Sequence, residues 1–206
     1  MKSKTAVLVM ALAMVVSVAK VCLAAKVLFE DKFATLDPSW GAPSAIMIVK
    51  NNKLVITPGK KTTQTIINQG SVFPNDTDIT FNMTFVKAPA PTWGSGLVFW
   101  AKDYSEYYAL LINANGWFAV QHHVANRYLL PVAWRSTDAI KKGAGAENQV
   151  QVVTKGNKAT ISVNGKELIT LSGQPPNGGS LIGFKVASGT NAANSAAFGD
   201  LKVTQP

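Results

Sequence analysis

The chain has 206 residues, of which 20 are Lys or Arg, 11 are Asp or Glu, 2 are His and 1 is Cys, giving a net charge of +9. Hydrophobic residues make up 47% of the chain and charged residues only 15%. This balance excludes an intrinsically disordered protein, because disorder requires low hydrophobicity and high charge. A single Cys excludes both a disulfide framework and a Cys-rich zinc site.

The first 24 residues have the pattern of a secretory signal peptide. Two lysines near the start precede an apolar run over residues 5–19, and small residues follow at Ala24 and Ala25. The run is shorter than the ~20 residues that a membrane helix needs. We therefore expect cleavage after Ala24 or Ala25 and a secreted or periplasmic protein with no membrane span. An uncleaved anchor is the alternative, because Lys20 interrupts the approach to the cleavage site.

Cleavage would change the charge and the redox chemistry of the chain. It removes three lysines and the only Cys, so the net charge falls from +9 to +6. A mature chain without a thiol suits an oxidising compartment. No linker, repeat or low-complexity tract interrupts residues 25–206, so we expect them to form one domain with one core.

The remainder of the chain is predicted to be all-β. Runs rich in β-branched and aromatic residues recur between Gly, Asn, Pro and Asp, and Asn164-Gly165 and Asn51-Asn52 are typical of hairpin turns. One helical turn is also expected at 136–140. Many short strands with tight turns predict a sandwich or barrel. The expected strands cover residues 26–33, 45–50, 53–58, 64–68, 78–87, 96–102, 106–113, 117–124, 127–134, 148–155, 158–163, 167–171, 180–186 and 196–204.

The central strands are apolar on both faces. We expect one face to pack on the core and the other to be partly covered or used for binding. Side chains alternate between the two faces of a strand. The alternation predicts that the open face carries Trp100, Lys102, Trp117, Gln121 and His123.

Several segments, taken in chain order, are similar to those of a known superfamily. They are Phe29-Glu-Asp-Lys-Phe, Gly96-Leu-Val-Phe-Trp-Ala with Asp103 and Glu106-Tyr-Tyr-Ala-Leu, Trp134-Arg-Ser, Asn148-Gln-Val-Gln-Val, Val163-Asn-Gly-Lys and Ala197-Phe-Gly-Asp-Leu-Lys-Val. Over residues 27–204 the chain resembles the concanavalin A-like lectin/glucanase superfamily, which includes laminin-G-like and 3-keto-disaccharide hydrolase-like jelly rolls. The resemblance implies an all-β jelly-roll sandwich of two antiparallel sheets, with the terminal strands paired. It does not imply one function, because the fold carries lectins, glycosidases, lyases and adhesive modules.

The acidic residues give no clear sign of catalysis. Retaining glucanases of this superfamily carry Glu-x-Asp-x-Glu on one strand, which places two carboxyl groups about 5 Å apart. The chain has no such motif, and the adjacent His122 and His123 face opposite sides of a strand, so they cannot share a metal. We therefore favour a non-catalytic protein. A glycoside hydrolase, of the keto-disaccharide type for example, or a lyase remains the alternative.

Aromatic and polar residues gather between positions 93 and 135. Sugars bind to aromatic faces, and nearby polar groups fix their hydroxyl groups. This cluster favours a secreted, non-catalytic, lectin-like module that binds carbohydrate or a cell surface; an adhesive protein that binds another protein is a further alternative. The candidate ligand-binding residues are Trp93, Trp100, Lys102, Tyr107, Trp117, Gln121, His123, Arg127, Trp134 and Arg135.

The resemblance also raises the question of a structural calcium ion, since many relatives carry one. Glu30, Asp31 and Asp200 lie on terminal strands that should be adjacent, and carboxylates suit calcium. Ordinary hydrogen bonding at strand ends is the alternative. The lysines are spread along the chain with no basic stripe, so the expected partner is a glycan or cell-surface polysaccharide rather than nucleic acid.

Overall fold

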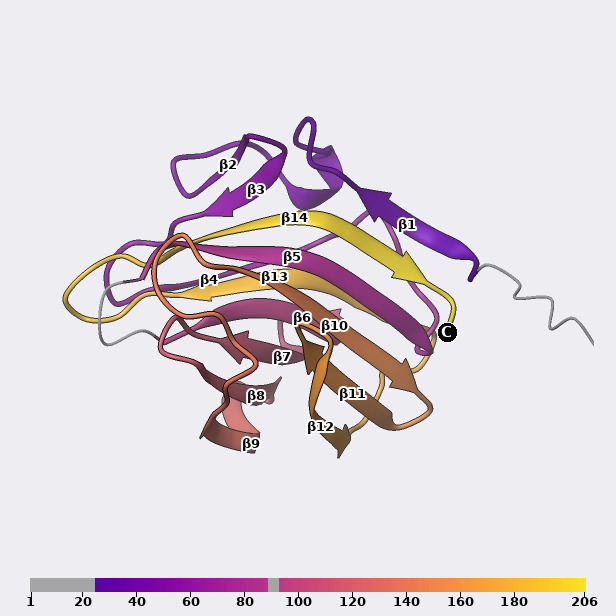
Figure 1. Cartoon of the computed structure of the whole chain (residues 1–206). Helices are drawn as coiled ribbons and strands as arrows, with labels where there is room; N and C mark the ends of the chain where they lie inside the picture. The colour runs from indigo at the N-terminus through magenta and orange to yellow at the C-terminus, as the bar shows by residue number, and fades with distance from the viewer. Residues whose placement is uncertain (1–24, 89–92) are drawn as a thin grey trace, which may run out of the picture.

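The computed structural model describes residues 25–88 and 93–206, so the predicted signal peptide lies outside the described residues. Two antiparallel sheets pack face to face in a jelly-roll sandwich, with β5 and β14 in the upper layer of Figure 1 and β6 to β9 in the lower layer. Within the two described ranges, no helix is long and apolar enough to cross a membrane.

One sheet has eight strands in the order β12-β11-β10-β5-β14-β3-β2, and β1 pairs with β14 outside this path. The pairing of β1 with β14 joins the two ends of the described chain, as the resemblance implies. The strands are β1 (Val27–Asp31), β2 (Met47–Lys50), β3 (Lys53–Ile56), β5 (Thr77–Lys87), β10 (Glu147–Lys155), β11 (Lys158–Val163), β12 (Lys166–Ser172) and β14 (Ser195–Thr204).

The other sheet has six strands in the order β4-β13-β6-β7-β8-β9. All its neighbouring pairs are antiparallel. The strands are β4 (Thr63–Ile67), β6 (Ser95–Asp103), β7 (Glu106–Ile112), β8 (Trp117–Val124), β9 (Arg127–Ser136) and β13 (Leu181–Ala187).

Each of the fourteen expected strands is present, and no boundary differs by more than two residues. The helical turn expected at 136–140 is wrong, because Ser136 continues β9 by pairing with Trp117 and bends follow it. The only short helix in the described part is a 3₁₀ turn at Pro38–Trp40, which the sequence analysis did not predict.

The hairpin turns have the backbone conformation that their residues favour. Asn164 and Gly165 have φ angles of 51° and 78° between β11 and β12, and Asn51 and Asn52 have 53° and 54° between β2 and β3. Two successive positive φ values define the type I′ turn, whose twist matches that of the paired strands. These turns set the register of both hairpins.

Aromatic side chains from both sheets fill the space between them. Phe184 on β13 stacks on Phe198 of β14 with ring centroids 4.1 Å apart, and Phe81 of β5 meets Phe184 edge-on at 5.3 Å. All three rings are fully buried. Such contacts add to the free energy of burial and hold the sheets together.

Candidate functional site

The six-stranded sheet is apolar on both faces, as the sequence predicts. Its inner face joins the core between the sheets, whereas its outer face, called the front face below, carries a second buried cluster. Trp134 and Leu181 pack against this cluster. The members of the cluster are Ile67, Val98, Ala101, Tyr107, Ala109 and Leu111.

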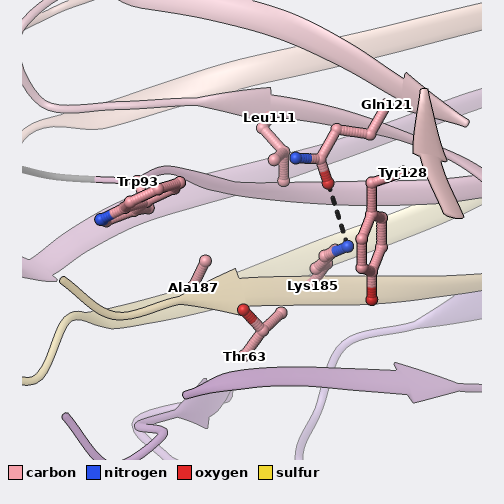
Figure 2. Close-up of a pocket in the computed structure, with 7 residues that line it drawn as sticks. All are labelled: Thr63, Trp93, Leu111, Gln121, Tyr128, Lys185 and Ala187. Atoms are coloured by element: carbon pink, nitrogen blue, oxygen red, sulfur yellow. Dashed lines mark hydrogen bonds between the residues drawn. The ribbon is translucent and has the colours of Figure 1, made fainter. Parts of the chain in front are cut away.

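A cavity of about 290 Å³ opens on the front face above this apolar floor. Trp93 stands at one end and Tyr128 at the other, with Gln121 and Lys185 between them (Figure 2). The cavity draws side chains from β4, β7, β8, β9 and β13 and from the segment before β6, so it spans the width of the sheet. It is lined by Thr63, Trp93, Leu111, Gln121, Tyr128, Lys185 and Ala187.

Lys185 is the polar centre of the cavity. Its Nζ donates to Gln121 Oε1 at 3.0 Å (Figure 2) and to the Tyr107 hydroxyl at 3.2 Å. The Nζ also lies 4.4 Å from the centre of the Tyr128 ring and 5.2 Å from that of Tyr107. Two neutral oxygens and two aromatic rings therefore surround this cation.

Burial shifts the protonation of two groups at this centre. The Lys185 side chain is only 2% exposed, and the loss of hydration lowers its pKa to about 8. Burial likewise raises the pKa of Tyr107 to about 12, against a smaller opposing effect of its hydrogen bond with Thr65. At neutral pH, Lys185 is therefore mainly charged and Tyr107 is a neutral hydroxyl.

Stacked rings form the wall of the cavity at the edge strand β9. Tyr128 stacks on His123 with centroids 4.5 Å apart, and His123 lies 5.1 Å from the Tyr107 ring. His123 Nδ1 is also 3.2 Å from the backbone carbonyl of Tyr104. These contacts place the Tyr128 ring beside Lys185, and the Tyr128 side chain remains 57% exposed.

Five of the ten predicted ligand-binding residues lie at or beside this cavity. Trp93 and Gln121 line it, while Tyr107 and His123 contact Lys185 and Tyr128. Trp134 packs on the apolar floor, where a Cβ at Gly94 would lie 2.8 Å from its ring. The structure therefore brings these five side chains together.

Four other predicted residues are exposed but lie outside the cavity lining. Lys102 forms an ion pair with Glu106 at 3.9 Å and lines a separate hollow with Gln174 and Pro175. Trp117, 42% exposed, lies at the start of β8. Arg127 and Arg135 are exposed on β9.

The predicted position of Trp100 on the open face is wrong. Trp100 is 2% exposed in the core between the sheets, where its Nε1 donates to the backbone carbonyl of Asn75 at 3.3 Å. It has a φ of 46°, and the register of β6 against β13 shifts at this point. This bulge inserts one residue, so Phe99 and Trp100 both face the core and Ala101 moves to the front face. The predicted open-face position of Lys102 is wrong for the same reason, because Lys102 follows Ala101 and points to the opposite side of the strand.

The carboxylates considered for calcium each have a partner within the described chain. Asp31 accepts hydrogen bonds from the Phe33 N–H at 2.7 Å and the Trp40 indole at 2.9 Å. Glu30 pairs with Lys32 and Asp200 accepts from Asn82. Among the residues that the structure describes, no group of three or more His, Cys, Asp or Glu side chains is placed to hold a metal. The alternative of hydrogen bonding at strand ends accounts for them.

Lys185 and Tyr128 are the functional candidates that the predicted set missed, together with Thr63, Leu111 and Ala187. A signal for Lys185 exists, because it is the one charged residue in the apolar stretch Leu181–Ala187. Its partners lie more than 50 residues away in sequence, so the stretch alone does not locate them.

Comparison with known proteins identifies the fold. No family model matches the chain, and no curated protein matches its sequence. A carbohydrate-binding module, CBM66 from Bacillus subtilis, matches with a TM-score of 0.59 at 12% identity over 73% of this chain and 86% of that chain. The exoplasmic/lumenal domain of VIP36, bound to Ca²⁺ and Man3GlcNAc, matches with a TM-score of 0.57 at 14% identity over 78% and 81%.

A third similar structure is the GH43 protein BlXynB from Bacillus licheniformis, with a TM-score of 0.62 at 13% identity over 86% of this chain and 39% of that one. At these identities the likeness shows the fold alone. The chain therefore has the concanavalin A-like jelly-roll fold that its sequence motifs resemble.

Proposed function

We propose that the protein is a secreted, non-catalytic carbohydrate-binding module whose ligand lies on the front face of the six-stranded sheet. The observation that carries this proposal is the cavity between Trp93 and Tyr128 (Figure 2). Both side chains are more than half exposed, at 54% and 57%. Exposed aromatic rings beside polar groups are the elements of a sugar site.

The polar groups between the rings suit sugar hydroxyl groups. Gln121 offers an amide on one side of the cavity and Thr63 a hydroxyl on the opposite side, with the Lys185 ammonium group between them (Figure 2). A pyranose ring stacked on Trp93 or Tyr128 would place its hydroxyl groups toward them. Sugar-binding proteins with the same fold, CBM66 by its name and VIP36 by its bound saccharide, support this proposal.

The non-catalytic part of the proposal rests on the lining of the cavity. Glycoside hydrolysis needs a pair of carboxyl groups flanking the scissile bond. The seven lining residues include no Asp or Glu. We therefore expect binding without cleavage, which reducing-end assays on the bound polysaccharide would test.

Secretion rests on the basic, apolar and small-residue pattern of residues 1–24. In a bacterial host, the expected location is the periplasm or the medium. Mass spectrometry of the exported protein should find Ala25 or Lys26 as its first residue. An intact N-terminus on a membrane-associated protein would contradict cleavage.

A broad glycan array tests the binding site. The wild-type protein is expected to bind a restricted set of the immobilised glycans. Trp93→Ala should weaken that binding by about tenfold or more, which is the range of an interface hot spot. Trp117→Ala is the matched control, because Trp117 is an exposed tryptophan of the same sheet that does not line the cavity.

Two results would contradict the proposal. Equal losses in the Trp93 and Trp117 variants would place the ligand elsewhere on the sheet. No retention of any glycan by the folded wild-type protein would remove carbohydrate as the ligand and favour the protein-binding alternative.

A further inference from the structure

A buried lysine in the front-face cavity lacks a negatively charged partner. Four ion pairs occur in residues 25–88 and 93–206, and Lys185 takes part in none of them. The contacts of its Nζ are the neutral oxygens of Gln121 and Tyr107 and two aromatic rings. Buried charges are usually paired, because the loss of hydration is costly.

We infer that the front-face site binds an acidic saccharide and that Lys185 binds the carboxylate of a uronic acid unit. This inference rests on the proposed function, since it names the class of sugar for the same cavity. The carboxylate would supply the counter-charge that the protein itself does not provide. A charge-assisted hydrogen bond of this kind is stronger than one between neutral groups.

The geometry leaves room for this contact. An ammonium group has three donors, and Gln121 and Tyr107 accept two of them. The Nζ lies at the edge of the cavity between Gln121 and Tyr128 (Figure 2). The Tyr128 ring covers it from an edge strand and is itself 57% exposed, so a side-chain rotation of Tyr128 would open the third donor to the ligand.

Lys185 is also charged under ordinary conditions. Burial lowers its pKa only to about 8, so the ammonium form predominates at pH 7. A purely structural role would be to hold Gln121 and Tyr107 in place. That role requires hydrogen-bond donors but gives no preference for an acidic ligand over its neutral counterpart.

Acidic polysaccharides compared with their neutral, carboxyl-reduced forms distinguish carboxylate binding by Lys185 from a purely structural role. The purified protein is titrated calorimetrically at pH 7 with polygalacturonate, alginate and hyaluronan, each beside its carboxyl-reduced form. A neutral dextran and its sulfate ester separate carboxylate recognition from attraction to any polyanion. We expect at least one polyuronate to bind about tenfold or more tightly than its reduced form, with no such gain for dextran sulfate.

Variants of Lys185 test whether this residue causes the preference for the acidic form. Lys185→Gln should remove the preference for the acidic form, so that this form binds no more tightly than the reduced form, while Lys185→Arg should retain part of the preference. Lys158→Gln is the matched control, because it removes the same charge from an exposed position on the other sheet. Circular dichroism confirms that each variant is folded.

Three outcomes would overturn the inference while the proposed function stands. They are equal binding of every acidic polymer and its reduced form, a gain for dextran sulfate as large as that for the polyuronates, and equal effects of Lys185→Gln and Lys158→Gln. No binding of any acidic, reduced or neutral polymer by the folded protein would instead contradict the proposed function itself.

Discussion

The outer faces of the two sheets differ in how far their side chains are exposed to water. On the eight-stranded sheet, β5 alternates between buried and partly exposed residues along most of its length. Outer side chains of neighbouring strands in this sheet bond to one another. Thr160 on β11 lies 2.8 Å from Thr170 on β12, and Gln151 on β10 donates to Asp78 on β5 at 2.9 Å. On the six-stranded sheet, β7 is buried at every position after Glu106.

This difference concerns what each outer face offers to a ligand. Around β5, β10, β11 and β12, the outer face of the eight-stranded sheet carries polar side chains that bond to one another, whereas Ile48 on β2 and Val86 near the end of β5 are exposed. The front face has an apolar floor beneath exposed aromatic side chains and contains a cation without a counter-charge. Such a surface is typical of a ligand site rather than of a solvated sheet.

The largest effect on stability should come from the layer that the two sheets share. Phe184→Ala removes a fully buried ring that contacts Phe198 and Phe81, and should lower the free energy of unfolding by about 3–5 kcal/mol. The control Thr160→Ala removes a contact on the polar outer face and should cost within about 1 kcal/mol. Urea unfolding followed by fluorescence measures both, and equal losses would contradict this division of the molecule.

A smaller effect should reveal the cost of the buried cation. Lys185 has a pKa of about 8 in the folded protein against 10.5 for the free side chain, so the unfolded state binds more protons between these values. The wild-type protein should therefore gain stability relative to Lys185→Met as the pH rises from 7 to 10, by about 1–3 kcal/mol. Urea unfolding of both proteins across this range measures the difference.

The other titratable groups facing Lys185 set the limits of that experiment. They are Tyr107, Tyr128 and, through its stack on Tyr128, His123. Burial raises the pKa of Tyr107 to about 12, so its contribution to stability is lost only as the pH rises above 10. A difference that stays flat or falls between pH 7 and 10 would show that Lys185 is not a buried cation.

The smallest effect is expected from removing calcium. Asp31 is bonded to Trp40 and to a backbone N–H, and Asp200 to Asn82, so these carboxylates have partners in the folded chain. EDTA should leave the melting temperature and glycan binding unchanged. A rise in melting temperature on adding calcium would show that an ion binds the folded state and would contradict this reading of the carboxylates.

Most of the fold could be predicted because its signals are local. Turn residues such as Asn164-Gly165 determine hairpins without reference to the rest of the chain, and all fourteen strands follow from such punctuation and from β-branched runs. The apolar character of both faces of β7 also predicted a covered or binding face.

The site could be predicted only in part, because its details depend on non-local contacts. Period-two alternation placed Gln121 and His123 correctly, but the bulge at Trp100 breaks the alternation in the middle of β6. Lys185 reaches its partners only when β13 lies two strands from β7 in the sheet. Neither the bulge nor this strand order can be predicted from the neighbouring residues in the sequence.

Amide hydrogen exchange tests most directly whether the front face is the binding surface. It is measured on the whole protein with and without the oligosaccharide that the protein binds best on the array. Ligand contact should slow exchange at β8, β9 and β13 around Gln121, Tyr128 and Lys185, and leave β11 and β12 unchanged. Slowed exchange on β11 and β12, with no change on β8, β9 and β13, would contradict it.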